Sequence, residues 1–167
     1  MKMILYTPVT LLMLLAACSP PASGPAPGSL KVEADGVTPT LSRSMGPALY
    51  NLEQINSVVE PLNHQQRISV SANDQLTVIG WAVDQNARKQ ASGVEIVVDG
   101  KAYRAKADLN RPDVSDHFKV QDYLKAGFNF SADAGAFGKG THQLAVRIVS
   151  NDGKSYFESP SVAVNVE

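Results

Sequence analysis

The sequence predicts an all-β domain in which two antiparallel sheets pack face to face. Three observations favour this fold class. From about Leu49 onward, apolar residues alternate with polar ones over segments of roughly four to eight residues. Glycine, asparagine and aspartate separate these segments, as in strands joined by turns. Convincing amphipathic helices are missing, and about eight strands in a domain of this size suit a sandwich, with a small β-barrel as the alternative.

The first predicted strands lie between residues 52 and 84. Residues 52–59 form the first, and residues 66–72 form the second with Ile68 and Val70 facing inward. Residues 75–84 carry apolar side chains at both odd and even positions, and these positions point to opposite faces of a strand. We therefore expect this strand to be central and covered on both faces. Trp81 lies in it, and a tryptophan at such a position usually fills the core of a sandwich.

The clearest predicted hairpin joins residues 94–98 to residues 101–104. Its connection is Asp99-Gly100, a dipeptide that tolerates positive φ and suits a two-residue type I′ turn. The other expected elements are, in chain order, a strand around residues 128–130, a single helical turn within 133–138, a hairpin of 142–149 with 154–158, and a last strand over 161–166 with its valines on one face.

Short motifs in a fixed order run through residues 52–156. They include Gly80-Trp81-Ala82-Val83-Asp84, Val98-Asp99-Gly100, Arg111-Pro112-Asp113-Val114, Gly127-Phe128 and Gly140-Thr141-His142. This order resembles an immunoglobulin-like module found in bacterial envelope proteins, including some that carry membrane glycosyltransferase-like regions. The resemblance implies an immunoglobulin-like β-sandwich over residues 48–167 and no particular enzymatic activity. The chain departs from the pattern at Asn56-Ser57, where such modules often have asparagine followed by glycine.

The first 17 residues are typical of an export signal. Lys2 precedes an apolar stretch that is shorter than the roughly 20 residues of a membrane span. The stretch ends in Leu15-Ala16-Ala17-Cys18, and Cys18 is the only cysteine of the chain. This motif resembles the lipobox of bacterial lipoproteins. The resemblance implies that diacylglycerol is attached to the Cys18 thiol, that the signal is cleaved before Cys18, and that the new amino group is acylated.

Two or three acyl chains would hold the mature protein at a membrane without a membrane span. Ser19 follows the cysteine where, in the enterobacterial pathway, an aspartate tends to retain lipoproteins in the inner membrane. The resemblance therefore implies a lipid-anchored protein of the bacterial cell envelope, at the outer membrane, facing the periplasm or the exterior.

Residues 18–47 are expected to form a lipidated N-terminus and a flexible linker. Residues 19–29 contain four of the ten prolines and no charge, so they cannot build a core. Residues 30–47 have few large apolar side chains. As a coil, residues 19–47 would span about 30 Å on average, which clears the lipid head-groups. The alternative is an N-terminal extension whose length serves no purpose.

Composition excludes several function classes. The formal net charge is −1, from 15 basic and 16 acidic residues, so the chain lacks the basic surface of a nucleic-acid-binding protein. Hydrophobic residues make up 44% of the chain, as in a globular protein that folds without disulfides.

The segment Arg111-Pro112-Asp113-Val114 is the most distinctive predicted loop. Proline fixes the backbone, and the Arg111 guanidinium is suited to clamp the Asp113 carboxylate or a ligand carboxylate with two hydrogen bonds. We favour the first alternative, a loop satisfied within the chain that caps the edge of the sandwich. Recognition of a ligand by Arg111 and Asp113 remains the second.

The residue spacings that calcium, zinc and common catalytic sites require are missing from the sequence. Aspartates and an asparagine between residues 108 and 122 offer oxygen ligands, but an EF-hand starting at Asp108 would need glycine and glutamate where Asp113 and Lys119 stand. The three histidines are widely separated and have no cysteine partners. No nucleophile elbow, P-loop or dinucleotide-binding turn is present in the sequence. We therefore expect no metal, no cofactor and no enzymatic activity.

The function expected from the sequence is an envelope-anchored interaction or structural module. Its partners would be the membrane, through lipid on Cys18, and an envelope protein or glycan, with no nucleic acid. The alternative is a carbohydrate-binding module for peptidoglycan or surface polysaccharide. That alternative needs an exposed aromatic platform, for which Trp81, Tyr103, Tyr123 and Tyr156 are the candidates.

Overall fold

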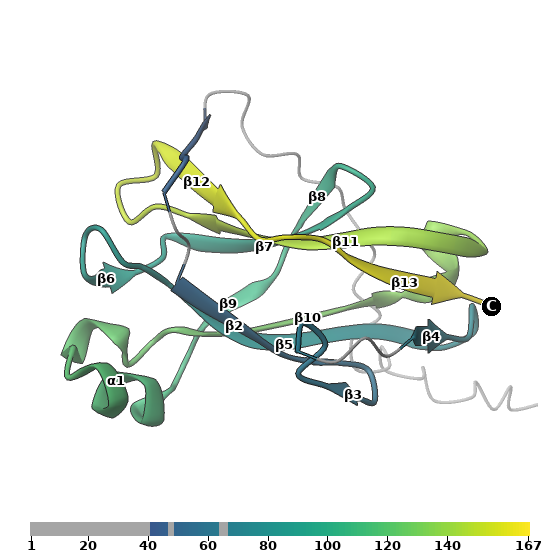
Figure 1. Ribbon diagram of the computed structural model, residues 1–167, viewed down its shortest axis with the longest axis horizontal. Helices are drawn as coiled ribbons and strands as arrows, with labels where there is room; N and C mark the ends of the chain where they lie inside the picture. The colour runs from purple at the N-terminus through teal and green to yellow at the C-terminus, as the bar shows by residue number, and fades with distance from the viewer. Residues whose placement is uncertain (1–40, 47–48, 64–66) are drawn as a thin grey trace, which may run out of the picture.

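Two β-sheets face each other in the computed structural model, which describes residues 41–46, 49–63 and 67–167 (Figure 1). The seven-stranded sheet contains β1 (Ser42–Arg43), β4 (Ile68–Val70), β7 (Gly93–Val98), β8 (Lys101–Arg104), β11 (Gly140–Val149), β12 (Ser155–Glu158) and β13 (Val162–Val166). The six-stranded sheet contains β2 (Leu49–Ile55), β3 (Val58–Val59), β5 (Gln75–Asp84), β6 (Lys89–Gln90), β9 (Lys106–Leu109) and β10 (Gly127–Asp133).

Most strand pairs are antiparallel, and the two parallel pairs lie at the edges of the seven-stranded sheet. These are β1 with β12 and β13 with β4. Within the described ranges, no strand pair joins the two sheets into a closed barrel. The prediction of an all-β sandwich is therefore confirmed.

The main core lies between the sheets because each strand alternates its side chains between the two faces. Ile55, Val78, Ile96, Val146 and Ile148 are completely buried in it. The valines of β13 share one face, as predicted, and two of them belong to this core.

Both predicted hairpins are present. Val98 pairs with Lys101, and the two connecting residues Asp99 and Gly100 both have positive φ, as a type I′ turn requires. Strands β11 and β12 pair on either side of the connection formed by residues 150–154. The helical turn expected near residue 135 is the 3-10 helix η2 (Ala134–Phe137).

The predicted first strand over residues 52–59 is wrong. Asn56 adopts a φ of 49°, so the chain turns back and β2 and β3 form a tight hairpin, with Ile55 paired to Val58. Asparagine tolerates this left-handed conformation better than most residues. A turn at Asn56 therefore interrupts the stretch that the sequence pattern predicted as one continuous strand.

Strand β5 is central, between β2 and β10, but the outer face of this strand is only partly covered. Ile79 remains 40% exposed there. Trp81 also faces outward and packs against Phe118, 5.7 Å between ring centroids, rather than filling the main core as predicted. The sandwich core at that position is filled by Phe128, which packs over Gly80.

A short helix covers this outer face, and the sequence analysis missed it. Helix α1 (Pro112–Phe118) begins with proline in its first turn, and the residue after it, Lys119, has a left-handed backbone conformation that caps the helix. The 3-10 helix η1 (Gln121–Tyr123) follows. Together they form an outer cluster with β5, made of Val83, Val114, Tyr123 and Ala126 and the flanking Leu49, Trp81, Phe118 and Val120. Seven residues are too few for a helical repeat to stand out in the sequence.

The folded unit begins earlier than residue 48, the predicted boundary. Ser42 and Arg43, which the sequence analysis assigned to the linker, pair with Ser155 and Tyr156 as strand β1. None of the described helices has the length and hydropathy that a membrane crossing needs. The predicted signal peptide, Cys18 and most of the predicted linker lie outside the described residues.

Candidate functional site

Arg111 connects helix α1 to strand β2. Its Nη1 and Nη2 atoms donate to the two carboxylate oxygens of Glu53, at 2.9 and 2.7 Å. Its Nε and Nη2 atoms donate to the two oxygens of Asp113, at 2.9 and 2.6 Å. One guanidinium thus binds two carboxylates, each with two hydrogen bonds, which is the geometry that gives arginine its strongest ion pairs.

Two local features of the sheet make room for this arrangement. A β-bulge between Leu52 and Gln54 inserts Glu53 as an extra residue, so Leu52 and Ile55 can both be buried although they are three positions apart. Gly127 lies under Arg111, and a Cβ atom there would come within 3.0 Å of the Arg111 Cγ. The bulge and the glycine therefore place the guanidinium between its two partners.

The guanidinium of Arg111 finds its hydrogen-bond acceptors within the chain, in Glu53 and Asp113. The hydrogen bonds from Arg111 hold the pKa of the Asp113 carboxyl at about 2, while Asp113 and Glu53 raise the pKa of Arg111. The favoured pairing of Arg111 with Asp113 is confirmed, although the segment is the start of α1 and not a loop. The guanidinium makes four hydrogen bonds to the carboxylates of Glu53 and Asp113. Because Glu53 belongs to β2 and Asp113 to α1, Arg111 holds α1 against β2.

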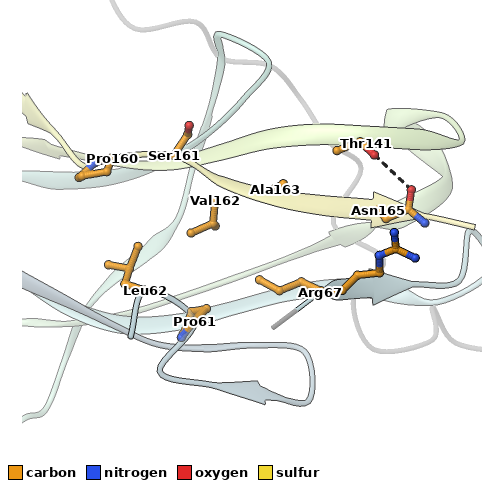
Figure 2. A pocket seen from close by; sticks show the side chains of 10 residues that line it. Pro61, Leu62, Arg67, Thr141, Pro160, Ser161, Val162, Ala163 and Asn165 are labelled. Carbon is orange, nitrogen blue, oxygen red and sulfur yellow. Dashed lines mark hydrogen bonds between the residues drawn. The ribbon is translucent and has the colours of Figure 1, made fainter. Parts of the chain in front are cut away.

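A groove of about 700 Å³ lies along the edge of the sandwich (Figure 2). One wall is the segment after β3, with Pro61 and Leu62, and the other is the start of β13. Val162 points from β13 towards Pro61 and Leu62, and Arg67 lies at the Asn165 end (Figure 2).

The lining of this groove combines apolar contact with a few polar groups. Leu62 is 40% exposed and is one of the apolar side chains that line the groove. Thr141 donates to the Asn165 side chain at 3.4 Å near the far end. Among the described lining residues only Arg67 carries a charge. Such a lining suits the binding of a partner surface or a small ligand.

His142 forms a second polar cluster, at the turn between β7 and β8. Its Nδ1 lies 2.7 Å from the Asp99 Oδ2, and its Nε2 lies 2.9 Å from the Gly138 carbonyl oxygen. Asp99 also accepts the backbone N–H of Gln143 at 2.8 Å. The hydrogen bond to Asp99 raises the pKa of His142, and the bonds from Gln143 and His142 lower the pKa of Asp99.

A row of alternating charge crosses the outer face of the seven-stranded sheet. Arg104 pairs in register with Glu95, Glu95 with Arg147, and Arg147 with Glu158. Arg147 donates to the Glu158 carboxylate at 2.8 and 3.0 Å. Arg43 of β1 extends the row, 3.6 Å from Glu158. Directly opposed opposite charges are favourable cross-strand neighbours.

Glu95 is the least satisfied member of this row. The residue is only 7% exposed, and its Oε2 is buried without a hydrogen-bond partner. The Nη1 atom of Arg147 lies 3.7 Å from this oxygen, beyond hydrogen-bonding distance. Burial raises the pKa of Glu95 despite the nearby arginines.

A small apolar cluster lies beside the charged row on the same outer face. It consists of Val97, Ala102 and Ala145, which pair in register and are 5%, 6% and 8% exposed. We call the five residues Glu95, Val97, Ala102, Ala145 and Arg147 the outer patch.

The other sequence-predicted candidates are not brought together into a site. No group of three or more acidic, histidine or cysteine residues within the described ranges is arranged to hold a metal ion. Of the four aromatic candidates for sugar stacking, Tyr103 and Tyr123 are buried, and Trp81 packs against α1. Tyr156 has the Arg147 guanidinium 4.3 Å above its ring. The described surface therefore lacks the exposed aromatic platform that the carbohydrate alternative requires.

Sequence reasoning missed Glu53, the His142 cluster and the charged row. The charged row could have been predicted from one feature of the sequence, since Glu95 and Arg147 are single charged residues inside otherwise apolar strands. A charge in such a segment needs a partner from a neighbouring strand. The partner of Arg111 had no comparable signal, since Glu53 is 58 residues away and reaches it through a bulge.

Comparison of the sequence with models of known protein families found no match, and a search of curated proteins found none either. The class that the structure defines is an all-β sandwich.

Proposed function

We propose that this chain is a bacterial lipoprotein whose immunoglobulin-like β-sandwich is a non-catalytic interaction module of the cell envelope. The single observation that carries the proposal is Cys18, the only thiol of the chain, directly after Leu15-Ala16-Ala17 at the end of an apolar leader. Lipid on Cys18 would anchor the protein at the outer membrane, and residues 19–29 would separate the domain from the lipid surface.

The groove in Figure 2 is better suited to binding a partner than to catalysing a reaction. Its walls are mainly apolar side chains and prolines, and its described lining contains one charged group, Arg67. Acid–base or nucleophilic catalysis needs at least two reactive groups that converge. Pro61, Leu62 and Val162 offer instead an apolar surface to an envelope protein.

The anchor is tested by labelling cells with a fatty-acid analogue. We expect the wild-type chain to incorporate the label and to fractionate with the outer membrane, and Cys18→Ser to do neither. A matched control is Ser19→Ala, which keeps the thiol and should be labelled normally. Labelling of the Cys18→Ser chain would rule out lipid attachment at this residue.

The groove is tested by placing a photo-crosslinking amino acid at Leu62 and, as a control, at Ile79. Both side chains are 40% exposed, but Ile79 lies on the outer face of the other sheet. We expect one discrete adduct from Leu62 in intact cells, with its mass identifying a protein, and no matching adduct from Ile79. A glycan adduct would favour the carbohydrate alternative, and equal yields from both positions would remove the groove as the binding surface.

A further inference from the structure

The 3-10 helix η2 closes one end of the apolar core. Phe137, its last residue, is half-buried and packs edge-on against Tyr103, with 5.5 Å between the ring centroids. Together with His142, Phe137 lines a small apolar space at this end of the sandwich. The other residues that line this space are buried core residues, namely Leu76, Val98, Leu144, Val164 and Val166. Phe137 therefore lies between these core side chains and solvent.

The two ends of η2 are held in different ways. At its start, Ala134 is completely buried and donates its N–H to the Asp74 carbonyl at 2.9 Å. Gly135 lies so close to the Ala72 carbonyl that a Cβ atom would come within 2.6 Å of the oxygen. After its end, Gly138 has a φ of 86°, and a Cβ atom there would meet nothing within 4 Å. The start is therefore fixed by packing, and the other end is held by hydrogen bonds.

His142 holds the end of η2 that is not packed. Its Nε2 lies 2.9 Å from the Gly138 carbonyl oxygen, while its Nδ1 lies 2.7 Å from the Asp99 Oδ2. Both partners are acceptors, so both contacts are hydrogen bonds only when the ring carries two protons. The protonated ring thus joins η2 to the β7–β8 turn.

Loss of one proton affects these two contacts unequally. The bond to the Asp99 carboxylate is charge-assisted and is stronger than a bond to a neutral carbonyl. The hydrogen bonds from Gln143 and His142 lower the pKa of Asp99, so this carboxyl stays ionised when His142 titrates. The remaining proton therefore stays on Nδ1, and Nε2 turns a lone pair towards the Gly138 oxygen. Deprotonation thus breaks the contact with η2 and keeps the contact with the turn.

Asp99 is the charged residue in direct contact with His142. The other charged residues of β8 and of the segments after η2 and β13 are exposed; they are Lys101, Arg104, Lys139 and Glu167. The Lys101 ammonium lies over the ring of the buried Tyr103, 5.5 Å from its centroid. The residue of β13 opposite His142 is the uncharged Val164. The hydrogen bond to Asp99 is therefore the main reason that the pKa of His142 is raised.

We propose that His142 is a pH-sensitive latch on η2, in which the protonated ring holds the Gly138 end of η2 closed over the core and deprotonation releases that end. Release lets Phe137 move away from the core side chains beneath it, while the β7–β8 turn stays tied to β11. The proposal depends neither on lipid at Cys18 nor on binding in the groove.

NMR of the full chain tests the latch, with Cys18→Ser to keep the chain free of lipid. Nitrogen shifts of the His142 ring should show both protons at about pH 6 and only the Nδ1 proton at about pH 9. The Gly138 amide, which donates to the Gly135 carbonyl at 3.1 Å, reports on η2. After correction for the intrinsic pH dependence of exchange, its protection factor should fall about three- to tenfold over this range, as expected for the loss of one hydrogen bond.

Gly153 is the matched control for Gly138. Its N–H donates to the Ser150 carbonyl at 2.9 Å in the β11–β12 connection, and its φ is also positive. We expect its protection factor to stay constant. His142→Gln removes the titrating ring and should make the protection of Gly138 independent of pH.

Asp99→Asn separates the latch from a general effect of charge on stability. Without the carboxylate, the neutral His142 ring can keep its proton on Nε2 and its bond to Gly138, so the alkaline loss of protection should disappear in this variant. Continued loss in Asp99→Asn would overturn the proposal. So would an Nε2 proton at alkaline pH in the chain that retains Asp99, constant protection of Gly138 there, or an equal loss at Gly153, which would mean that the whole domain loosens.

Discussion

The His142 imidazole lies between two acceptors, the Asp99 carboxylate at 2.7 Å and the Gly138 carbonyl at 2.9 Å. A neutral imidazole has one N–H donor and would leave one acceptor facing a lone pair, so this geometry favours the protonated ring. Because Asp99 belongs to the β7–β8 turn, the charged pair ties that turn to β11.

Stability should therefore fall at alkaline pH through His142. The pKa of His142 is raised above the ordinary 6.5, so its stabilising contribution is fully present below pH 6.5 and is lost as the pH rises through the raised value. We expect His142→Gln to flatten the free energy of unfolding between about pH 6 and 9. Denaturant titrations at a series of pH values measure this, and an unchanged pH dependence would contradict it.

The Asp99→Asn variant separates the charge from the turn. Asparagine also tolerates a positive φ and can accept the Gln143 N–H, but it removes the carboxylate. The pKa of His142, followed by NMR of its ring protons, should fall towards 6.5 in this variant. A pKa that stays raised would show that Asp99 is not the main cause.

The two carboxylate partners of Arg111 should contribute unequally to stability. The Glu53 side chain is 33% exposed and the Asp113 side chain is 62% exposed, so solvent screens the second pair more. We expect Glu53→Gln to cost more free energy of unfolding than Asp113→Asn, and Arg111→Ala to cost about 1–3 kcal/mol. Chemical denaturation of the three variants gives the ranking, and the reverse order would contradict this account of the corner.

Gly80→Ala should destabilise the sandwich strongly. A Cβ at this position would overlap the backbone oxygen of Asn51 and approach the Phe128 ring within 2.9 Å. Since both neighbours belong to paired strands, we expect a loss of more than about 2 kcal/mol. Gly93→Ala is the matched control, because the nearest atoms to its Cβ would be 3.9 Å away. Thermal melting of both variants tests the difference.

The only tryptophan reports on helix α1. Phe118→Ala removes the ring that packs against Trp81 and against Tyr123, so α1 should loosen and Trp81 should become more solvated. We expect a red shift of the fluorescence emission in the folded protein, and no shift in Asp116→Ala, an exposed change in the same helix. An unchanged emission in Phe118→Ala would show that α1 stays in place without this ring.

The sequence predicted the parts of the fold that local rules determine. Alternating valines predicted β13, and a continuous apolar run predicted β5 as a central strand. The Asp99-Gly100 dipeptide identified its hairpin because both residues tolerate the positive φ of a type I′ turn. The partner of each strand across the sandwich was not predictable, since non-local pairing leaves no local pattern. Helix α1 was missed because its stability comes from Trp81 beneath it and not from a long helical repeat.

The polar sites were predictable only where both partners are close in sequence. Arg111 and Asp113 are two residues apart and were paired correctly. Glu53 reaches the same guanidinium through a bulge, and Asp99 reaches His142 across 43 residues. These distances depend on sheet register, which a single sequence does not specify.

The segment from β8 to β9 gives this domain an unusual internal link. Lys101–Arg104 belongs to the seven-stranded sheet and Lys106–Leu109 to the six-stranded sheet, with Ala105 donating to the Val94 carbonyl between them. Because one short piece of backbone is hydrogen-bonded into both layers, neither layer can open without loosening the other. The two sheets should therefore exchange their amide hydrogens as one cooperative unit, and separation of the layers should coincide with global unfolding.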